Sequence, residues 1–457
     1  MIAAVVGGEL AGPGGDRTVD GFSFDTRTLT AGALFFAIRG ARDGNAFVRD
    51  AIRAGAAGAV ISERGLLSDP ELAAAPLILV GDTIAALQAL GHHVRRASGA
   101  AVVAVTGSAG KSTTKEIAAE FLSTRYRVFR NKGNLNNHIG LPLSLLELRR
   151  NPDIGVFELG MNHFGEISTL VRIAQPDVRV WTNVGPAHLE FFGTVDAIAE
   201  AKAEIMEDVG KDDVLIANAD DDLVMRHAAH FEGRVRTFGI DRPADIRALD
   251  VHDLGVDGTV ARMRTPVGEA EIQTPLPGTA NLSNVLAAAA VAIRFDVPLQ
   301  AIAERAAVLK PIEHRGEISR VGDVTVMDDS YNSNPKALSG ALAMLARARR
   351  YRRRVAVIGE MLELGEASDE LHRAAGEEAA QSGLAELLVV GGAAARTLAD
   401  AALRAGMPSA AVHYLRDSQA AADLAVSLVK PGDLVLVKGS RGIRTEVVVD
   451  RLKAELA

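Results

Sequence analysis

An apolar strand that turns through glycines into a helix decides the fold class of this 457-residue chain. The strand is AVVAVTG (101–107), the turn is TGSAGKST (106–113), and the helical segment is KSTTKEIAAEFL (111–122). A continuous apolar run of this length is typical of a parallel strand that helices cover on both faces. The segment therefore predicts an α/β fold built on a largely parallel sheet.

The same turn predicts a phosphate site. Its glycines let backbone N–H groups approach phosphate oxygens, and the helix N-terminus favours negative charge. Lys111 is placed to reach the β- and γ-phosphates, and the Ser112 hydroxyl to hold Mg²⁺. Val105 stands where the full Walker A spacing has a glycine, but the strand before the turn and the helix after it support the motif. We expect a nucleoside triphosphate to contact the residues of this loop: Thr106, Gly107, Ser108, Ala109, Gly110, Lys111, Ser112 and Thr113.

The pattern along the chain predicts three α/β domains. Residues 1–98 show the short strands and helices of a small domain. Residues 99–313 alternate strand-like and helical runs, which indicates a central phosphate-loop domain with a mostly parallel sheet. The pattern restarts at residues 314–457 as a Rossmann-like domain without a GxGxxG turn, so no dinucleotide site is expected there. Residues 310–316 are the predicted hinge between the last two domains.

Composition excludes several classes of protein. Lys and Arg number 50 against 58 Asp and Glu, without a long block of like charge, which argues against a nucleic-acid-binding protein. The absence of cysteine excludes disulfides, thiolate nucleophiles and Cys-ligated metals. No apolar run reaches the length of a membrane helix. We expect a cytoplasmic monomer that acts on small molecules, binds no nucleic acid and inserts into no membrane.

Three polar residues follow the strands of the central domain. Glu158 ends the apolar run DIGVFELG, His188 lies in TNVGPAHLEFFG, and Lys202 lies in AKAEIME. Taken singly, each also has a structural interpretation: a strand-end carboxylate, a loop histidine and a solvated helix lysine. The carboxyl ends of parallel strands meet at one edge of a sheet, the edge that also holds the phosphate loop. We therefore expect these residues near that loop.

The phosphate loop, ELG, AHLEFFG and AKAEI, in this order and spacing, resemble the Mur ligase family. The resemblance implies that Glu158 and His188 bind a second Mg²⁺ and that Lys202 carries a CO₂-derived carbamate supporting the same ion. It thus implies the metal ligands Ser112, Glu158, His188 and Lys202. It implies a catalytic set of Lys111, Lys202, Glu158, His188 and Arg315.

Further segments resemble the nucleotide contacts of the family. In PGTANLSNVLAAAAVA (277–292), Asn281 and Asn284 are expected beside the base, although Asn281 alone would also suit a helix N-cap. Arg315 in HRGE is expected at the γ-phosphate, and Asp329 in DDSYNSNP at the ribose. Tyr331 stands where a sister ligase carries a lysine, so that lysine's phosphate contact is not expected here.

Two segments resemble the family's contacts with a UDP-linked muramoyl peptide. The first is SFDTRTLTAGALFFAIRGARDGNAF (23–47), although Asp25 and Arg27 would equally suit a turn-stabilising pair. The second is GNLNNHIGLPLSLL (133–146), where a capped turn explains the glycines but not the three asparagines. The expected contacts are Asp25, Thr26, Arg27, Gly40, Asp43, Asn45, Asn134, Asn136 and Asn137.

The third domain resembles the branch of the family that adds D-alanyl-D-alanine. GEMLELG (359–365) and LVKGSRG (436–442) carry this resemblance, whereas the Asn-Pro-Arg element and the KGHE-like ending expected of the diaminopimelate- or lysine-adding branch are not present. The expected dipeptide contacts are Tyr331, Asn332, Asn334, Glu360, Ser440 and Arg441.

The implied activity is an ADP-forming amide ligase of peptidoglycan precursor synthesis. A UDP-N-acetylmuramoyl-tripeptide carboxylate would attack the γ-phosphate of ATP, and D-alanyl-D-alanine would attack the resulting acyl phosphate. ATP, two Mg²⁺ ions and the carbamate are the implied cofactors, and closure about the hinge would assemble the site. Alternatives are a diaminopimelate- or lysine-adding ligase, a folylpolyglutamate synthase, and a phosphate-loop NTPase scaffold or transport ATPase.

Overall fold

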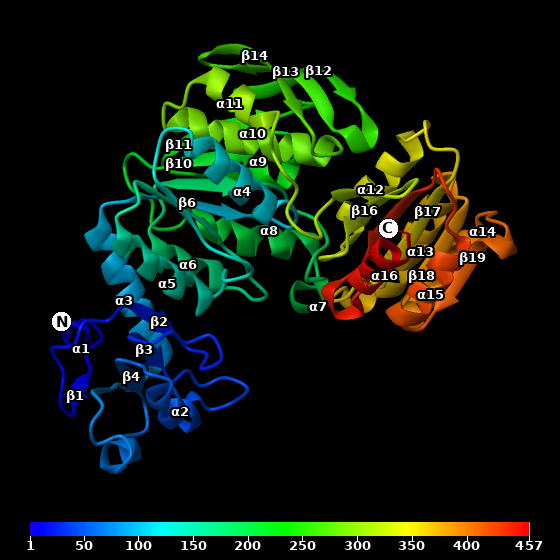
Figure 1. Cartoon of the computed structure of the whole chain (residues 1–457). Helices are drawn as coiled ribbons and strands as arrows, with labels where there is room; N and C mark the ends of the chain where they lie inside the picture. The colour runs from blue at the N-terminus through cyan, green and yellow to red at the C-terminus, as the bar shows by residue number, and fades with distance from the viewer. Residues whose placement is uncertain (457) are drawn as a thin grey trace. The chain divides into compact units, whose positions relative to one another are not determined.

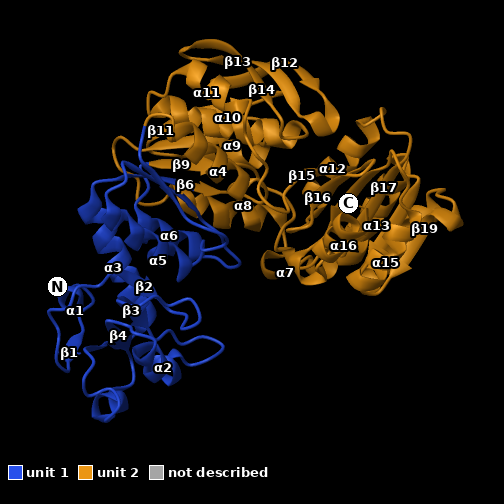
Figure 2. Cartoon of the chain, viewed as in Figure 1, with its two compact units in different colours: residues 1–104, 126–177 blue, residues 105–125, 178–457 orange. Residues whose placement is uncertain are grey.

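The computed structural model describes residues 1–456, which form two compact units (Figure 2). One unit comprises residues 1–104 and 126–177, and the other comprises residues 105–125 and the chain from 178 onward. The chain forms three β-sheets, of five, nine and six strands, in which most neighbouring strands run parallel. The predicted α/β fold with three sheets is confirmed.

The first unit begins with a five-stranded sheet. Its order is β1 (Glu9–Ala11), β5 (Leu77–Leu79), β4 (Gly58–Ile61), β3 (Ala33–Phe36), β2 (Gly21–Ser23). β1 pairs antiparallel with β5, and the remaining pairs are parallel. The central strands β3 and β4 are buried along their whole length, so apolar cores form on both faces of the sheet. The helices beside this sheet are α1 (Ile2–Val5), α2 (Val48–Arg53) and α3 (Thr83–Ser98).

A buried guanidinium contributes to holding the rest of the first unit against α3. Arg95, 7% exposed, donates hydrogen bonds to the carbonyls of Ala100, Ala174 and Gln175 and pairs with Asp177 at 2.8 Å. These contacts anchor α3 to the segment after α6. The elements of this part are β7 (Val128–Arg130), α5 (Gly140–Leu145), β8 (Ile154–Glu158) and α6 (Glu166–Ala174). β6 (Ala101–Thr106) begins in this unit and ends in the second.

The first half of the second unit carries six strands in the order β9-β10-β11-β12-β13-β14. Figure 1 labels β10 to β14 of this series. The pairs from β9 to β12 are parallel, and β12, β13 and β14 form an antiparallel meander. The strands are β9 (Val178–Trp181), β10 (Val214–Asn218), β11 (Arg234–Gly239), β12 (Ile246–Asp253), β13 (Thr259–Thr265) and β14 (Gly268–Thr274). The helices are α4 (Lys111–Leu122), α7 (Leu189–Phe192), α8 (Val195–Ala203), α9 (Asp222–Ala228), α10 (Thr279–Arg294) and α11 (Leu299–Ala306).

The second half of this unit is a six-stranded sheet in the order β15-β16-β20-β17-β18-β19. β15 runs antiparallel to β16, and the remaining pairs are parallel. The strands are β15 (Glu317–Val321), β16 (Val324–Asp329), β17 (Arg354–Gly359), β18 (Glu386–Val390), β19 (Val412–Leu415) and β20 (Leu434–Lys438). The helices are α12 (Pro335–Arg347), α13 (Ser368–Gln381), α14 (Ala393–Arg404), α15 (Ser418–Leu428) and α16 (Glu446–Leu456). Because β20 lies between β16 and β17, the loops that follow these three strands share one edge.

Within residues 1–456, each helix is too short or too polar to cross a bilayer.

Candidate active site

The phosphate loop has the predicted geometry. β6 ends at Thr106 and α4 begins at Lys111, whose Nζ donates to the Gly107 carbonyl at 2.8 Å. Gly107 and Gly110 have φ values of 149° and 81°. A Cβ on Gly107 would lie 1.9 Å from Thr182 Oγ1, and one on Gly110 would lie 2.3 Å from Asn284 Oδ1. Both positions therefore require glycine, and the loop closely approaches two distant segments.

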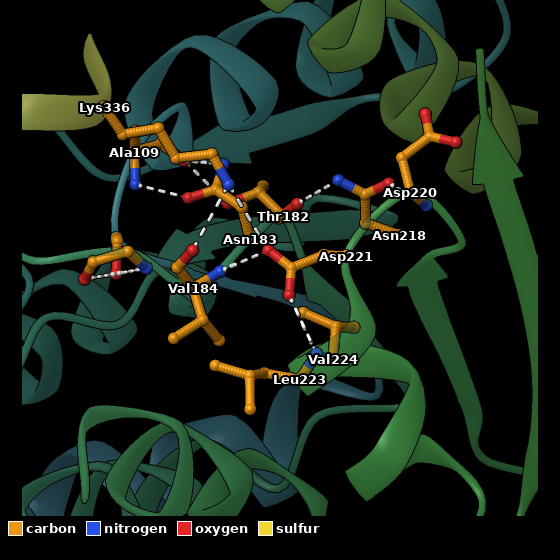
Figure 3. Close-up of polar contacts among 12 residues, drawn as sticks. Ala109, Thr182, Asn183, Val184, Asn218, Asp220, Asp221, Leu223, Val224 and Lys336 are labelled. Atoms are coloured by element: carbon orange, nitrogen blue, oxygen red, sulfur yellow. Dashed lines mark hydrogen bonds and ion pairs between the residues drawn. The ribbon is translucent and has the colours of Figure 1, made fainter. Parts of the chain in front are cut away.

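One of those segments is residues 182–185, which follow β9 (Figure 3). Asn183 accepts from the Ser108 N–H through its carbonyl at 3.0 Å and from the Ala109 N–H through its side chain at 2.9 Å. The Asn183 side-chain amide donates to the Ala109 carbonyl at 3.0 Å, and Thr182 Oγ1 donates to the same carbonyl at 2.7 Å. Thr182 and Asn183 were not predicted to hold the loop, although a polar pair directly after an apolar strand was a signal.

The other segment is the start of α10. Asn284 Oδ1 accepts from Thr114 Oγ1 at 3.2 Å, and the Asn284 amide donates to Asn281 Oδ1 at 3.3 Å. The predicted pair of asparagines therefore does lie beside the phosphate loop. The alternative of Asn281 as an N-cap is wrong, because Gly278 caps the helix and Asn281 is its third residue.

A hollow opens next to these asparagines. Residues of α4, of the start of α10 and of the hinge segment form its walls. Its lining residues are Thr113, Glu116, Ile117, Glu120, Leu276, Asn281, Leu309, Lys310, Pro311, Ile312 and Arg315. The predicted nucleotide residues Thr113, Asn281 and Arg315 thus share one concave surface.

A stack of two cations on one aromatic ring continues from this hollow. The Arg315 guanidinium carbon lies 3.9 Å from the centre of the Tyr331 ring, and that of Arg441 lies 5.0 Å from the same centre. Guanidinium groups are attracted to the faces of aromatic rings. The stack brings the arginine predicted at the γ-phosphate beside two residues predicted to contact the dipeptide.

Asp329, the predicted ribose contact, has a partner that the sequence analysis missed. Lys438 is 2% exposed, and its Nζ lies 2.7 Å from Asp329 Oδ2 and 3.0 Å from the Asn332 carbonyl. A buried ammonium needs such partners, so Lys438 fixes the loop after β16 to the end of β20. Lys438 follows the apolar run of β20, and its partner Asp329 lies 109 residues away in the sequence, so the ion pair could not be recognised from the local pattern.

The hinge is held by a histidine and a buried carboxylate. His314 Nδ1 lies 2.7 Å from Asp328 Oδ2, and Asp328 Oδ1 accepts from the Ser330 hydroxyl at 2.5 Å. Partial burial opposes the positive charge of His314, but the hydrogen bond and the negative charge of Asp328 raise its pKa above the ordinary value. His314 has a φ of 60°, and Gly316 a φ of 72°, so the chain turns sharply on both sides of Arg315.

The predicted metal ligands divide between the two units. Glu158, in the first unit, is 4% exposed and accepts from the Asn136 amide at 2.8 Å, while its N–H donates to Asn131 Oδ1 at 3.1 Å. Lys202, in the second, is 2% exposed, so its interpretation as a solvated lysine is wrong. The meeting of these two residues stays a prediction.

His188, the third predicted ligand of the second Mg²⁺, contacts a loop of the third sheet. It has a φ of 61°, and its Nδ1 lies 2.6 Å from Glu363 Oε2. The hydrogen bond from His188 lowers the pKa of Glu363. Among residues 1–456, no group of three or more His, Asp or Glu side chains could hold a metal ion. Carboxylate oxygens are ligands that Mg²⁺ prefers, but Glu158 and His188 lie in different units, so a second Mg²⁺ shared by them and Lys202 stays a prediction.

The predicted UDP contacts of residues 23–47 are tied to one another. The Arg27 side chain binds Asp25 through both carboxylate oxygens, at 2.9 and 2.6 Å, and this hydrogen bonding lowers the pKa of Asp25 to about 2. The turn-stabilising pair therefore forms. Asp43 accepts from the backbone and side-chain N–H groups of Asn45, at 2.9 and 2.8 Å. Asn45 also bonds Ser62, whereas the added Cβ of Gly40 would meet open space. Contacts of these residues and Thr26 with a ligand stay predictions.

The predicted asparagines of the 133–146 segment have separate roles in the fold. Asn137 Oδ1 accepts from the Gly140 N–H at 2.8 Å and therefore fixes the turn before α5. Asn136 orients the Glu158 carboxylate, as described above, and the Asn134 carbonyl accepts from the Asn136 N–H at 2.8 Å.

The predicted dipeptide residues lie at the shared edge of β16, β17 and β20. Ser440 Oγ accepts from the Leu362 N–H at 2.9 Å and contacts the Ser333 carbonyl at 3.4 Å. The carbonyl of Asn332 binds Lys438, and Glu360 accepts from the Gly392 N–H. Asn334 instead caps α12 by accepting from the Ala337 N–H at 2.9 Å, which explains its place in the loop without a ligand.

Comparison with known proteins identifies the class to which this fold and site belong. Residues 105–292 match the Mur ligase middle domain, and residues 314–441 match the Mur ligase, glutamate ligase domain. The chain belongs to the Mur ligase family.

Relatives that match most or nearly all of the chain share one name. A protein of Bacillus subtilis (strain 168) is 34% identical over 99% of this chain and 97% of its own length. A protein of Escherichia coli (strain K12) is 38% identical over 86% of this chain and 85% of its own. Both are named UDP-N-acetylmuramoyl-tripeptide--D-alanyl-D-alanine ligase.

Solved structures agree with this comparison. MurF from Acinetobacter baumannii superposes with a TM-score of 0.88 at 28% identity, covering 99% of this chain and 98% of that chain. MurF ligase from Thermotoga maritima, solved in complex with ADP, has a TM-score of 0.84 at 29% identity, covering 96% and 99%.

Proposed function

We propose that this chain joins D-alanyl-D-alanine to UDP-N-acetylmuramoyl-tripeptide and releases UDP-N-acetylmuramoyl-pentapeptide, ADP and phosphate. The observation that carries the proposal is the stack of Arg315, Tyr331 and Arg441. The acyl phosphate would form beside Arg315, at the γ-phosphate, and the amine that attacks it must be held next to it. The proposed dipeptide residues Tyr331 and Arg441 belong to the same stack, at that position. Relatives that share the full length of the chain carry the name of this activity.

The phosphate loop binds and orients ATP. Backbone N–H groups at the start of α4 face the phosphates, and Lys111 moves from the Gly107 carbonyl to the transferring phosphate. Asn281 and Asn284 hold the base, Asp329 contacts the ribose, and Arg315 neutralises charge as the tripeptide carboxylate attacks. Ser112 would hold a Mg²⁺, which would supply charge neutralisation for the phosphates.

Glu158, His188 and Lys202 would hold a second Mg²⁺, which would supply positive charge for the acceptor carboxylate and the γ-phosphate. Asn136 orients Glu158 for this role, and Glu363 orients His188. Lys202 takes part as a carbamate, which changes its charge from positive to negative. Incubating the protein with ¹³C-bicarbonate is expected to give a carbamate ¹³C signal that disappears in Lys202→Ala. The same signal in both proteins would contradict the role of Lys202.

The proposal extends to the organisation of the chain. Residues 1–98 bind the UDP-muramoyl substrate through Asp25, Thr26, Arg27, Gly40, Asp43 and Asn45, and Asn134, Asn136 and Asn137 lie toward its peptide. Residues 99–313 bind ATP, and residues 314–457 bind the dipeptide through Tyr331, Asn332, Asn334, Glu360, Ser440 and Arg441. The protein acts as a monomer in the cytoplasm, the compartment in which its nucleotide-linked substrate is made.

The proposal is tested by the mass of the product. Incubation with ATP, Mg²⁺, UDP-N-acetylmuramoyl-tripeptide and D-alanyl-D-alanine is expected to add the mass of one dipeptide less one water to the nucleotide substrate. A product that gains diaminopimelate, lysine or glutamate and never the dipeptide would favour another branch of the family. ADP formation that needs no amine would favour a scaffold or transport NTPase.

A further inference from the structure

Residues 182–185 have a second set of contacts besides those with the phosphate loop. On the loop side, the Ser108 hydroxyl donates to the Gly185 carbonyl and accepts from the Gly185 N–H, both at 3.0 Å. Asn183 is also hydrogen-bonded to Ser108 and Ala109, as described above. The position of the phosphate loop therefore depends on the position of residues 182–185.

On its other side the segment is bound by a carboxylate. Asp221, 9% exposed, accepts from the Val184 N–H at 2.9 Å through Oδ2. Its other oxygen accepts from the Leu223 and Val224 N–H groups at 3.2 Å, which caps α9 (Figure 3). Both carboxylate oxygens are therefore engaged, so Asp221 has a fixed position from which it holds Val184.

The same carboxylate receives a cation from α12. Lys336 Nζ lies 3.4 Å from Asp221 Oδ2 and donates to the Val184 carbonyl at 3.2 Å. A Cβ built on Gly185 would lie 3.2 Å from Lys336 Cδ, so the lysine stem lies along this glycine. Lys336 is the second residue of α12, whose N-terminus Asn334 caps. Figure 3 shows the lysine reaching from α12 across to Val184 and Asp221.

We infer that Lys336 is a positioning residue for the nucleotide: by binding Val184 and Asp221 it fixes residues 182–185 and, through them, the phosphate loop. ATP affinity is then coupled to the docking of α12, and therefore to the part of the chain that carries the proposed dipeptide site. This inference rests on the proposed use of the loop by ATP, and it assigns Lys336 no contact with substrate.

The other end of α12 offers a matched control. Arg347, the last residue of the helix, lies 3.3 Å from Asp253 at the end of β12. The side chains of Lys336 and Arg347 are 51% and 57% exposed, and each pairs with a carboxylate that is at most 15% exposed. If α12 acted only by packing against the neighbouring sheet, loss of either cation would change the nucleotide affinity by the same factor.

The test compares Lys336→Met, Arg347→Met and Lys336→Arg in the full chain. Calorimetric titration with Mg²⁺-ADP is expected to show about fivefold weaker binding for Lys336→Met, the size of one partly exposed ion pair. Arg347→Met is expected to stay within about twofold of the unsubstituted protein, and Lys336→Arg to recover most of the affinity. In turnover, Lys336→Met raises the KM for ATP and leaves the KM for the UDP-linked substrate unchanged.

Two results would overturn the inference: equal ADP affinity in Lys336→Met and the unsubstituted protein, or equal weakening in Lys336→Met and Arg347→Met. Melting temperatures are compared first, and Lys336→Gln replaces Lys336→Met if the latter melts lower. Failure of the unsubstituted protein to bind ADP would instead contradict the proposed function, and the inference with it.

Discussion

The phosphate loop and the edge that carries Tyr331 and Arg441 are built in two different ways. The phosphate loop is one contiguous turn between β6 and α4, whose glycines allow its conformation and which the side chains of Thr182 and Asn183 hold in place. The dipeptide edge is assembled from the loops after β16, β17 and β20, which side chains hold together over long stretches of sequence. A local motif thus supplies the phosphate-binding turn, whereas the dipeptide edge has no such motif and depends on folding of the whole sheet.

The largest expected effect is at the contiguous site. Lys111→Met removes the charge that the loop places beside the transferring phosphate, so the rate of phosphate release should fall by about a thousandfold. Steady-state phosphate release with all three substrates measures this. The melting temperature should change little, because Lys111 is half-buried and bonds its own loop. A loss below about tenfold would contradict the role of the loop in phosphoryl transfer.

At the dipeptide edge a smaller and more selective effect is expected. Arg441→Met removes a cation suited to the carboxylate of the dipeptide, and its KM for D-alanyl-D-alanine should rise by about thirtyfold while its KM for ATP stays constant. Arg444→Met is the control, since Arg444 is exposed and its nearest acidic partner, Glu446, lies 3.9 Å away. If the unsubstituted protein used D-alanyl-D-alanine amide as well as the free acid, the carboxylate would not be the group that Arg441 recognises.

The hinge before this edge should give the smallest effect and a dependence on pH. The folded-state pKa of His314 is raised, so the pair with Asp328 stabilises the fold below pH 6.5 and this contribution is lost as the pH rises through the folded-state value. His314→Gln should therefore lower the free energy of unfolding by about 1 kcal/mol at pH 6 and by less at pH 9. Denaturant unfolding at both pH values measures the difference. Equal losses would show that the charge of His314 does not hold the hinge.

Local patterns explain which parts of the fold could be predicted from the sequence. β6 and α4 carry a continuous apolar run and a clear start signal, and both were predicted close to their observed bounds. β15 and β19 are short, half-buried edge strands that carry no such local signal, because they form only by pairing with β16 and β18.

The candidate site shows the same division. The contacts of Asn284 and Arg315 were expected through family resemblance, and the structure places both beside the phosphate loop or its hollow. Lys438 and Asp328 were missed, because a buried ion pair is recognised only when both partners are placed in space. Asn137 and Asn334 accept hydrogen bonds from backbone N–H groups at helix starts, a role that Asn fills in many folds, and their contacts with ligands stay predictions.

The central claim is that the contiguous phosphate loop and the assembled dipeptide edge act in one reaction. It is tested most directly by phosphate release from ATP in the presence of UDP-N-acetylmuramoyl-tripeptide, with and without D-alanyl-D-alanine. Rapid release that requires both the nucleotide-linked tripeptide and the dipeptide is the predicted result. Release at the same rate without the dipeptide, or with a single amino acid in its place, would contradict the account.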